Sequence, residues 1–290
     1  MWTVKLPEAG DTDAQLNAAL IYVNGNFVYE LSVAERAAIH DLYADYHQRR
    51  GEPDPALIPA ALVGCADALH GAYGQVQKGQ RLASLRETLL AAVLECPLCG
   101  SAPATTLDHH LPKDDYRALS INPRNLVPCC QPCNRAKGTL VAVAGQGMIH
   151  AYYQALPEVT FFRADVTYGG GSLVVKFGIN PAGVTPALAA RLQFQLDRMK
   201  LNERHPDAVN VFLFSIKPSL EWFRGKPGER NLIQDWLVHA ANTYDRDFGL
   251  NHWRTAVLRG LAVCAPFLDD PWAYFDKPPP AMQAAEPEPV

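Results

Sequence analysis

Two cysteine pairs, Cys96 with Cys99 and Cys130 with Cys133, constrain this chain more than any other feature of its sequence. Each pair has the C-x-x-C spacing with which one tight turn presents two thiolates to a metal ion, and together they supply four ligands for tetrahedral zinc. Such a site is closed to further ligands, so the zinc would be structural. Cys129 could replace Cys130 at a longer spacing; we favour Cys130 because its spacing matches the first pair.

The rest of the composition favours metal ligation over disulfides. The chain has no run of 18 apolar residues, and its first residues lack the apolar segment of a signal peptide. We therefore expect a cytoplasmic protein with no membrane partner, in a compartment where thiols stay reduced. Cys65 and Cys264 lie in apolar, helical surroundings, so we expect them in the core.

The length and charge limit the function classes. A chain of 290 residues is long enough for about two domains. Its formal net charge of −4 excludes a generally basic nucleic-acid coat, so any contact with phosphates must be local. Between positions 101 and 140 the charges are five Lys or Arg against three Asp, a locally positive balance.

Residues 1–95 are expected to be mostly helical. Ser32 and Glu35 have the spacing of a capping box and are followed by apolar residues at helical intervals. A second helix is predicted from about residue 55, and a third from about Gln80 to Leu94, where leucines recur on one face.

Residues 141–275 are expected to combine a hairpin with helices, which makes the whole chain α+β. Apolar and polar residues alternate from about Val159 to Ile179 on both sides of a glycine run, which predicts a β-hairpin with one buried face. That face carries Phe162, Val166, Val175 and Phe177.

Helices should follow this hairpin. Thr185 precedes a proline and apolar residues at helical intervals, and so predicts a capped helix. Further helices are predicted near residues 229–244 and 251–263. The Pro-rich, acidic stretch 276–290 is predicted to be a disordered tail.

The stretch TTLDHHLPKDDY, residues 105–116, lies between the two cysteine pairs and carries the polar residues that a closed zinc site leaves without a role. Asp108, His109 and His110 stand directly before Leu-Pro-Lys. Taken alone, they could be a polar turn that happens to contain histidines. Asn125 and Asn134 follow downstream, the latter directly after the last cysteine, and favour a functional site.

The pattern C-x-x-C, DHHLPK and NLVPCCQPCNRAK resembles the HNH endonucleases, the zinc-supported form of the ββα-metal nucleases. The resemblance defines a central module over residues 96–140, with its motifs in fixed order. The wider frame, including LRETLLAAVLECPLCG before the module and HAYYQALPEVTFFRADV after it, resembles uncharacterised bacterial HNH proteins, some of them thought to act in anti-phage defence.

The resemblance implies a role for each polar residue. The family motif is a metal ligand followed at once by the general-base histidine, then two residues and a proline. Asp108 therefore matches the ligand and His109 the base, while His110 is one residue out of phase. Asn125 matches the residue that shapes the loop, and Asn134 a second ligand for a catalytic Mg²⁺ or Mn²⁺ ion.

Four further residues are candidates for substrate contact. Lys113, Arg135 and Lys137 could touch phosphates, or could be ordinary solvated surface charges. His110 could touch the substrate or pack beside the site.

We therefore interpret the chain as a metal-dependent HNH endonuclease that hydrolyses phosphodiester bonds in nucleic acid, with DNA favoured. One alternative is a zinc-stapled module that binds nucleic acid or protein without cleavage. Another is the nuclease subunit of a defence or toxin system that is active only with a partner protein such as an ATPase. The chain has no phosphate-binding loop of the Walker type, so energy coupling would have to come from another chain.

Overall fold

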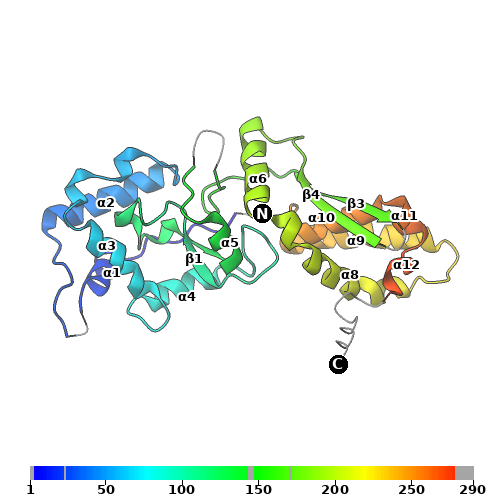
Figure 1. Cartoon of the computed structure of the whole chain (residues 1–290), viewed down its shortest axis with the longest axis horizontal. Helices are drawn as coiled ribbons and strands as arrows, with labels where there is room; N and C mark the ends of the chain where they lie inside the picture. Colours follow the sequence, from blue (N-terminus) through cyan, green and yellow to red (C-terminus); the bar gives the residue numbers. More distant parts are fainter. Residues whose placement is uncertain (1–2, 23, 143–146, 170–171, 278–290) are drawn as a thin grey trace, which may run out of the picture. The chain divides into compact units, whose positions relative to one another are not determined.

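A computed structural model of the chain describes residues 3–22, 24–142, 147–169 and 172–277. The tail predicted for residues 276–290 lies outside this range except for its first two residues. Helices and two small antiparallel sheets make up the described chain (Figure 1), which confirms the α+β fold class.

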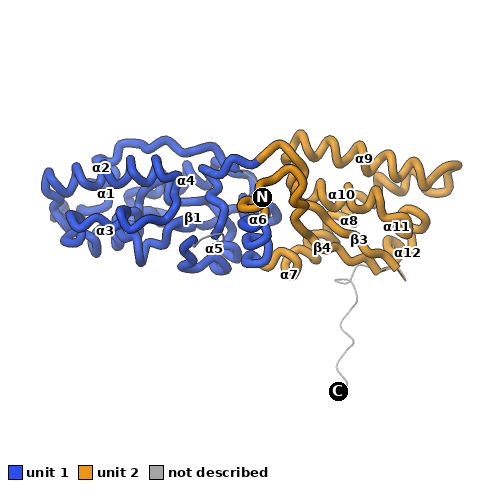
Figure 2. Tube along the Cα trace, turned by 90° about the horizontal axis from the view of Figure 1, so that it is seen from above, with its two compact units in different colours: residues 1–156, 190–199 blue, residues 157–189, 200–290 orange. Residues whose placement is uncertain are grey.

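Contacts divide the chain into two compact units (Figure 2). Unit 1 comprises residues 1–156 and 190–199, and unit 2 comprises residues 157–189 and 200–290. The domain boundaries predicted at residues 95 and 140 both fall inside unit 1. One hydrophobic core there joins the N-terminal helices to the central module, with Leu69 buried in the same cluster as Leu107 and Leu119.

Side chains cap the first two helices of unit 1, Asp11 before α1 (Thr12–Ala19) and Ser32 before α2 (Val33–Gln48). The unit also contains α3 (Ala66–Ala72), α4 (Ala83–Ala91) and α5 (Gln131–Lys137). The capping box before α2 is present: Ser32 Oγ accepts from the Glu35 amide at 3.2 Å, and Glu35 Oε2 accepts from the Ser32 amide at 2.8 Å. The predicted third helix is shorter than expected, because α4 covers only its middle.

The prediction of one continuous helix from about residue 55 is wrong. The chain instead forms short 3₁₀ turns at Pro55–Leu57 and Ala60–Leu62 before α3. Pro59 explains the break, because a proline disfavours helical backbone at the preceding residue and has no amide to donate. Ile58 accordingly lies outside the helical region, at φ −124° and ψ 66°.

Within the described residues no single helix combines the length and apolar character needed to cross a bilayer. The bent pair Pro55–Leu62 and Ala66–Val76 satisfies those criteria only when its two parts are taken together.

The central module consists of two strands followed by a helix. Strands β1 (Thr106–His109) and β2 (Leu126–Cys129) pair antiparallel, with Asp108 opposite Val127. The loop between them contains two 3₁₀ turns, Arg117–Leu119 and Pro123–Asn125. Helix α5 starts two residues after β2 ends and packs against β1 (Figure 1).

Unit 2 is built on the predicted hairpin. Its elements are β3 (Phe162–Gly169), β4 (Ser172–Ile179), α7 (Leu201–Arg204), α8 (Pro206–Glu221), α9 (Glu229–Phe248), α10 (Trp253–Ala262), α11 (Ala265–Asp269) and α12 (Trp272–Phe275). Helix α6 (Pro186–Arg198) belongs to unit 1 from residue 190 onwards. On the hairpin, Phe162 and Phe177 are buried and stack at 5.3 Å, whereas Val166 and Val175 are only half-buried.

Gly260 allows α10 to lie directly on β3. A Cβ at this position would come within 2.5 Å of the Ala164 carbonyl oxygen and 2.7 Å of Val166 Cγ2. Gly260→Ala should therefore lower the free energy of unfolding by about 1–3 kcal/mol through overpacking, although alanine is the better helix former. Denaturant unfolding followed by circular dichroism measures the change.

Gly71→Ala is the matched control, because Gly71 lies in α3 with nothing within 4 Å of the added Cβ. It should leave stability unchanged or raise it by up to about 1 kcal/mol. If Gly260→Ala were as well tolerated as Gly71→Ala, the close packing of α10 on β3 would be wrong.

Candidate active site

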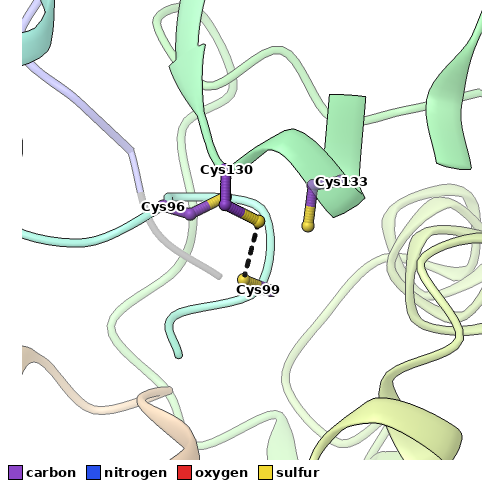
Figure 3. Close-up of side chains that lie close together, drawn as sticks. All are labelled: Cys96, Cys99, Cys130 and Cys133. Carbon is purple, nitrogen blue, oxygen red and sulfur yellow. Dashed lines mark hydrogen bonds between the residues drawn. The ribbon is translucent and has the colours of Figure 1, made fainter. Parts of the chain in front are cut away.

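The four cysteines of the two C-x-x-C pairs converge at one point of unit 1 (Figure 3). Cys96 and Cys99 come from the loop after α4, Cys130 stands directly before α5, and Cys133 lies in the first turn of that helix. All four are buried, and their Sγ atoms lie within 4.8 Å of one another. Cys99 Sγ and Cys130 Sγ are 3.8 Å apart.

The distance of 3.8 Å between the sulfurs of Cys99 and Cys130 is the one that a tetrahedral zinc site requires. Metal–sulfur bonds of about 2.3 Å in a tetrahedron place the sulfurs about 3.8 Å from one another. Hydrogen bonds from Cys130, Cys133 and Cys96 hold the pKa of Cys99 below its ordinary value. The residues therefore fit a structural zinc site.

The remaining cysteines of the described chain lie apart from the cluster, in agreement with the choice of Cys130 over Cys129. Cys129 ends β2, and its Sγ contacts Thr106 Oγ1 at 3.4 Å. Cys65 contacts the Leu62 carbonyl oxygen at 3.4 Å, and both Cys65 and Cys264 are buried as expected.

His109 ends β1 and is held by the loop that follows. Its Nε2 lies 2.9 Å from the carbonyl oxygen of Ser120, which can only accept a hydrogen. The ring therefore carries its proton on Nε2, and Nδ1 is left as the basic nitrogen. Tyr73 packs edge-on against the ring at 4.3 Å. Burial lowers the pKa of His109 to about 4, with the Ser120 carbonyl opposing the shift, so the ring is neutral at pH 7.

Asp108 points to the opposite face of β1, toward α5. Lys137 Nζ lies 3.3 Å from Asp108 Oδ1, 3.2 Å from its Oδ2 and 2.6 Å from the His109 carbonyl oxygen. Burial raises the pKa of Asp108 to about 6, while the Lys137 ammonium opposes that shift. The structure thus places Lys137 in a buried ion pair, 1% exposed, instead of on the phosphate-facing surface that its sequence context suggested.

Asn134 lies one turn before Lys137 on α5, on the same helix face. Its Nδ2 donates to Thr106 Oγ1 at 3.2 Å and to the Leu107 carbonyl oxygen at 3.3 Å. Its Oδ1 has no hydrogen-bond partner among the described residues. Thr106 and Asp108 share one face of β1, so a carboxylate and an amide oxygen lie between this strand and α5. This pair of donors suits a hard divalent ion such as Mg²⁺.

Asn125 is fully buried and organises the loop between β1 and β2. Its Nδ2 donates to the carbonyl oxygens of Leu111 and Leu119 at 3.0 and 3.3 Å. Its Oδ1 accepts from the Leu111 amide at 2.8 Å and from the Tyr46 hydroxyl at 3.0 Å. These contacts match the loop-shaping role that the resemblance implies.

His110 faces the interior. Its ring lies 3.9 Å from that of His150 and is 7% exposed. Burial holds its pKa well below the ordinary value. Of the two roles considered for His110, this geometry favours packing beside the site over contact with substrate.

The basic candidates Lys113 and Arg135 are placed differently from Lys137. Arg135 is exposed on α5. Lys113 Nζ lies 2.7 Å from His70 Nε2, and both groups contact Asp114. The charges of Lys113 and His70 contribute to the lowered pKa of His109, so they lie near the base.

Sequence reasoning missed two neighbours of His109. His70 lies on α3 and Tyr73 in the 3₁₀ turn Tyr73–Val76, both ahead of the HNH motifs in the chain. No local pattern singles them out, because they approach β1 only through the fold.

Comparisons with known proteins agree with this geometry. Residues 96–140 match the family model described as HNH endonuclease. Protein ea31 of Escherichia phage lambda is 36% identical over 85 residues, which are 28% of this chain and 28% of the phage protein. Septu protein PtuB of Bacillus thuringiensis is 47% identical over 45 residues, 16% of this chain and 18% of that protein.

Each of these similarities thus spans less than a third of either protein. No solved structure matches the chain significantly. The family match covers the two cysteine pairs, both strands and α5. Residues 96–140 of this chain are an HNH endonuclease domain.

Proposed function

We propose that the chain is a metal-dependent endonuclease that hydrolyses phosphodiester bonds in DNA, with His109 as the general base. The observation that carries this proposal is the hydrogen bond from His109 Nε2 to the Ser120 carbonyl, because it leaves Nδ1 as the basic nitrogen of a neutral ring. A positioned neutral imidazole is suited to deprotonating water.

In the reaction, His109 Nδ1 accepts a proton from the attacking water. The water oxygen then bonds to phosphorus, and the bond from phosphorus to the leaving oxygen breaks. Its electron pair goes to the leaving oxygen, which takes up a proton from solvent water. The Ser120 carbonyl accepts the Nε2 hydrogen throughout, and so stabilises the imidazolium that forms. Loop residues held by Asn125 thereby fix the direction in which the basic nitrogen points.

Asp108 and Asn134 would hold the catalytic ion. When bound, a Mg²⁺ or Mn²⁺ ion would neutralise charge that builds up on the phosphate oxygens. Lys137 supports this site from α5, because its ammonium keeps the buried Asp108 carboxylate ionised. Arg135 and Lys113 remain the candidates for contact with substrate phosphates.

The setting of this activity is also a proposal. The resemblance to bacterial HNH proteins and the similarity to a Septu protein support a role in anti-phage defence within the cytoplasm, alone or with a partner protein such as an ATPase. Unit 2 lies outside the family match, and we assign it the selection of the target or partner. A module that binds without cleavage is the competing function.

Zinc should be bound at the four cysteines and should support folding. Cys99→Ser is expected to lose zinc and to lower the melting temperature, because a closed site needs all four thiolates. Cys129→Ser, which changes a buried cysteine outside the cluster, should retain zinc. Elemental analysis and thermal unfolding measure both effects; zinc-free wild-type protein would refute the assignment.

His109→Ala should cleave DNA about 10² to 10⁴ times more slowly than wild type, because a positioned base contributes about that factor. His110→Phe should keep substantial activity, since a phenyl ring can still stack on His150. Plasmid cleavage with Mg²⁺, Mn²⁺ or EDTA gives the rates, while zinc content and DNA binding confirm that each variant is intact.

Two outcomes would contradict these roles. An active His109→Ala together with an inactive but folded His110→Phe would exchange the two histidines. Full activity in both variants would remove the HNH mechanism, and DNA binding without any wild-type cleavage would favour the binding module.

Lys137→Met should lower the free energy of unfolding by about 3–5 kcal/mol, because it leaves a buried carboxylate without its cation. Added Mg²⁺ should restore part of this loss and raise the melting temperature more than it does in wild type. Lys113→Met is the control, since its partly exposed ion pair is worth about 0–1 kcal/mol. Equal stability of the two variants, or equal responses to Mg²⁺ in Lys137→Met and wild type, would argue against this role.

A further inference from the structure

We propose that Tyr46 and His150 are positioning residues for His109, although both lie outside the HNH domain. Tyr46 belongs to α2, and His150 lies beyond α5 in the same compact unit. A chain of buried hydrogen bonds joins them to the loop that holds the catalytic base. This inference rests on the proposed function and adds residues that the family match does not include.

The first half of this hydrogen-bond path runs from His150 through the Tyr46 hydroxyl to Asn125. His150 Nδ1 accepts from the Tyr152 amide at 3.2 Å, so His150 carries its hydrogen on Nε2. That nitrogen lies 2.9 Å from the Tyr46 hydroxyl oxygen and donates to it. The Tyr46 hydroxyl donates its own hydrogen to Asn125 Oδ1 at 3.0 Å, the nearer of two acceptors, since the Arg124 carbonyl oxygen lies 3.4 Å away.

The second half runs through the loop to the base. Asn125 Nδ2 donates to the carbonyl oxygen of Leu119, the residue directly before Ser120. The Ser120 carbonyl oxygen accepts from His109 Nε2. Tyr46 is therefore connected to the base through the Asn125 side chain and the backbone of Leu119 and Ser120.

This network is closed to water. Tyr46 and Asn125 are 0% exposed and His150 is 2% exposed. Gly51, which follows α2 with φ +75°, allows the backbone to pack directly against His150. A Cβ at this position would come within 2.3 Å of His150 Cδ2. A group that loses its partner in such a place finds no water to replace it, so the remaining groups must shift or stay unsatisfied.

Short-range backbone hydrogen bonds and the Asn125 side chain together hold this loop, and the Tyr46 contact adds to them. Between β1 and β2 the loop forms two short 3₁₀ turns, and the His110 amide donates to the Asn125 carbonyl oxygen at 2.8 Å, which joins its two ends. Near the base, Asn125 Nδ2 donates to the carbonyl oxygens of Leu111 and Leu119, and the Tyr46 hydroxyl on α2 donates to Asn125 Oδ1. A displacement of about 1 Å at a catalytic group can cost about 10²-fold in rate, so a lost link should reduce turnover more than substrate binding.

Tyr46→Phe tests this hydrogen-bond path from His150 to the loop, because it removes only the hydroxyl oxygen. We expect kcat for DNA cleavage to fall at least about tenfold, with KM, DNA affinity and zinc content unchanged. Tyr43→Phe is the matched control, because Tyr43 lies on the same helix and its buried hydroxyl has no hydrogen-bond partner within the described chain. Its cleavage rate should equal that of wild type.

His150→Phe is the second variant. It keeps an aromatic ring against His110 but removes the hydrogen bonds of the imidazole. Since the two changes interrupt one path, the double variant with Tyr46→Phe should be no more than about twofold slower than the slower single variant. If the fold-losses in cleavage rate of the two single variants multiplied in the double variant, the two residues would not act through one path.

Amide hydrogen exchange at Leu111 gives a measure that does not depend on cleavage, because this amide donates to Asn125 Oδ1. It should exchange at least about tenfold faster in Tyr46→Phe and remain unchanged in Tyr43→Phe. If wild type cleaves no DNA, the proposed function fails. The exchange rate at Leu111 then tests by itself whether Tyr46 holds Asn125 and the loop in place.

Three results would overturn the positioning role. The first is cleavage by Tyr46→Phe at the rate of Tyr43→Phe in an active protein. The second is an unchanged exchange rate at Leu111. The third is loss of zinc or of helical circular dichroism in both Tyr46→Phe and His150→Phe, which would make the network purely structural.

Discussion

The contact among four buried thiols is the constraint on which the rest of the site depends. It ties the loop after α4 to the start of α5, a helix of seven residues that would not be stable in isolation. Because Cys130 and Cys133 are fixed, the next turn of the helix must lie across β1. That position brings Asn134 and Lys137 to the strand face that carries Asp108.

The end of β1 then separates two functions that are adjacent in sequence. Alternation along the strand sends Asp108 toward α5, where an ammonium neutralises it, and sends His109 toward the loop, where a carbonyl fixes its tautomer. One side of the strand thus carries the paired carboxylate, and the other carries the neutral imidazole. The loop between the strands is in turn held by Asn125, which α2 supports through Tyr46.

How much of this could be predicted depends on the sequence separation of the residues involved. The cysteine cluster, the capping box of α2 and the β3–β4 hairpin have short, regular spacings, and all three are present. Helix α8 was not predicted, although Pro206 stands at its start and apolar residues follow at helical intervals; the internal Pro218 interrupts that pattern. The burial of Lys137 and the Tyr46–His150 bond, 104 residues apart, arise only from tertiary packing.

The proposed mechanism requires that the fold hold His109 as a neutral base with its hydrogen on Nε2. Nitrogen-15 spectroscopy of the histidine rings, with His109 assigned by comparison with His109→Ala, measures this directly in the zinc-loaded full chain. We expect a protonated Nε2 and an unprotonated Nδ1 at neutral pH, because the Ser120 carbonyl can only accept a hydrogen bond. A hydrogen on Nδ1, or a doubly protonated ring at that pH, would contradict the proposed mechanism.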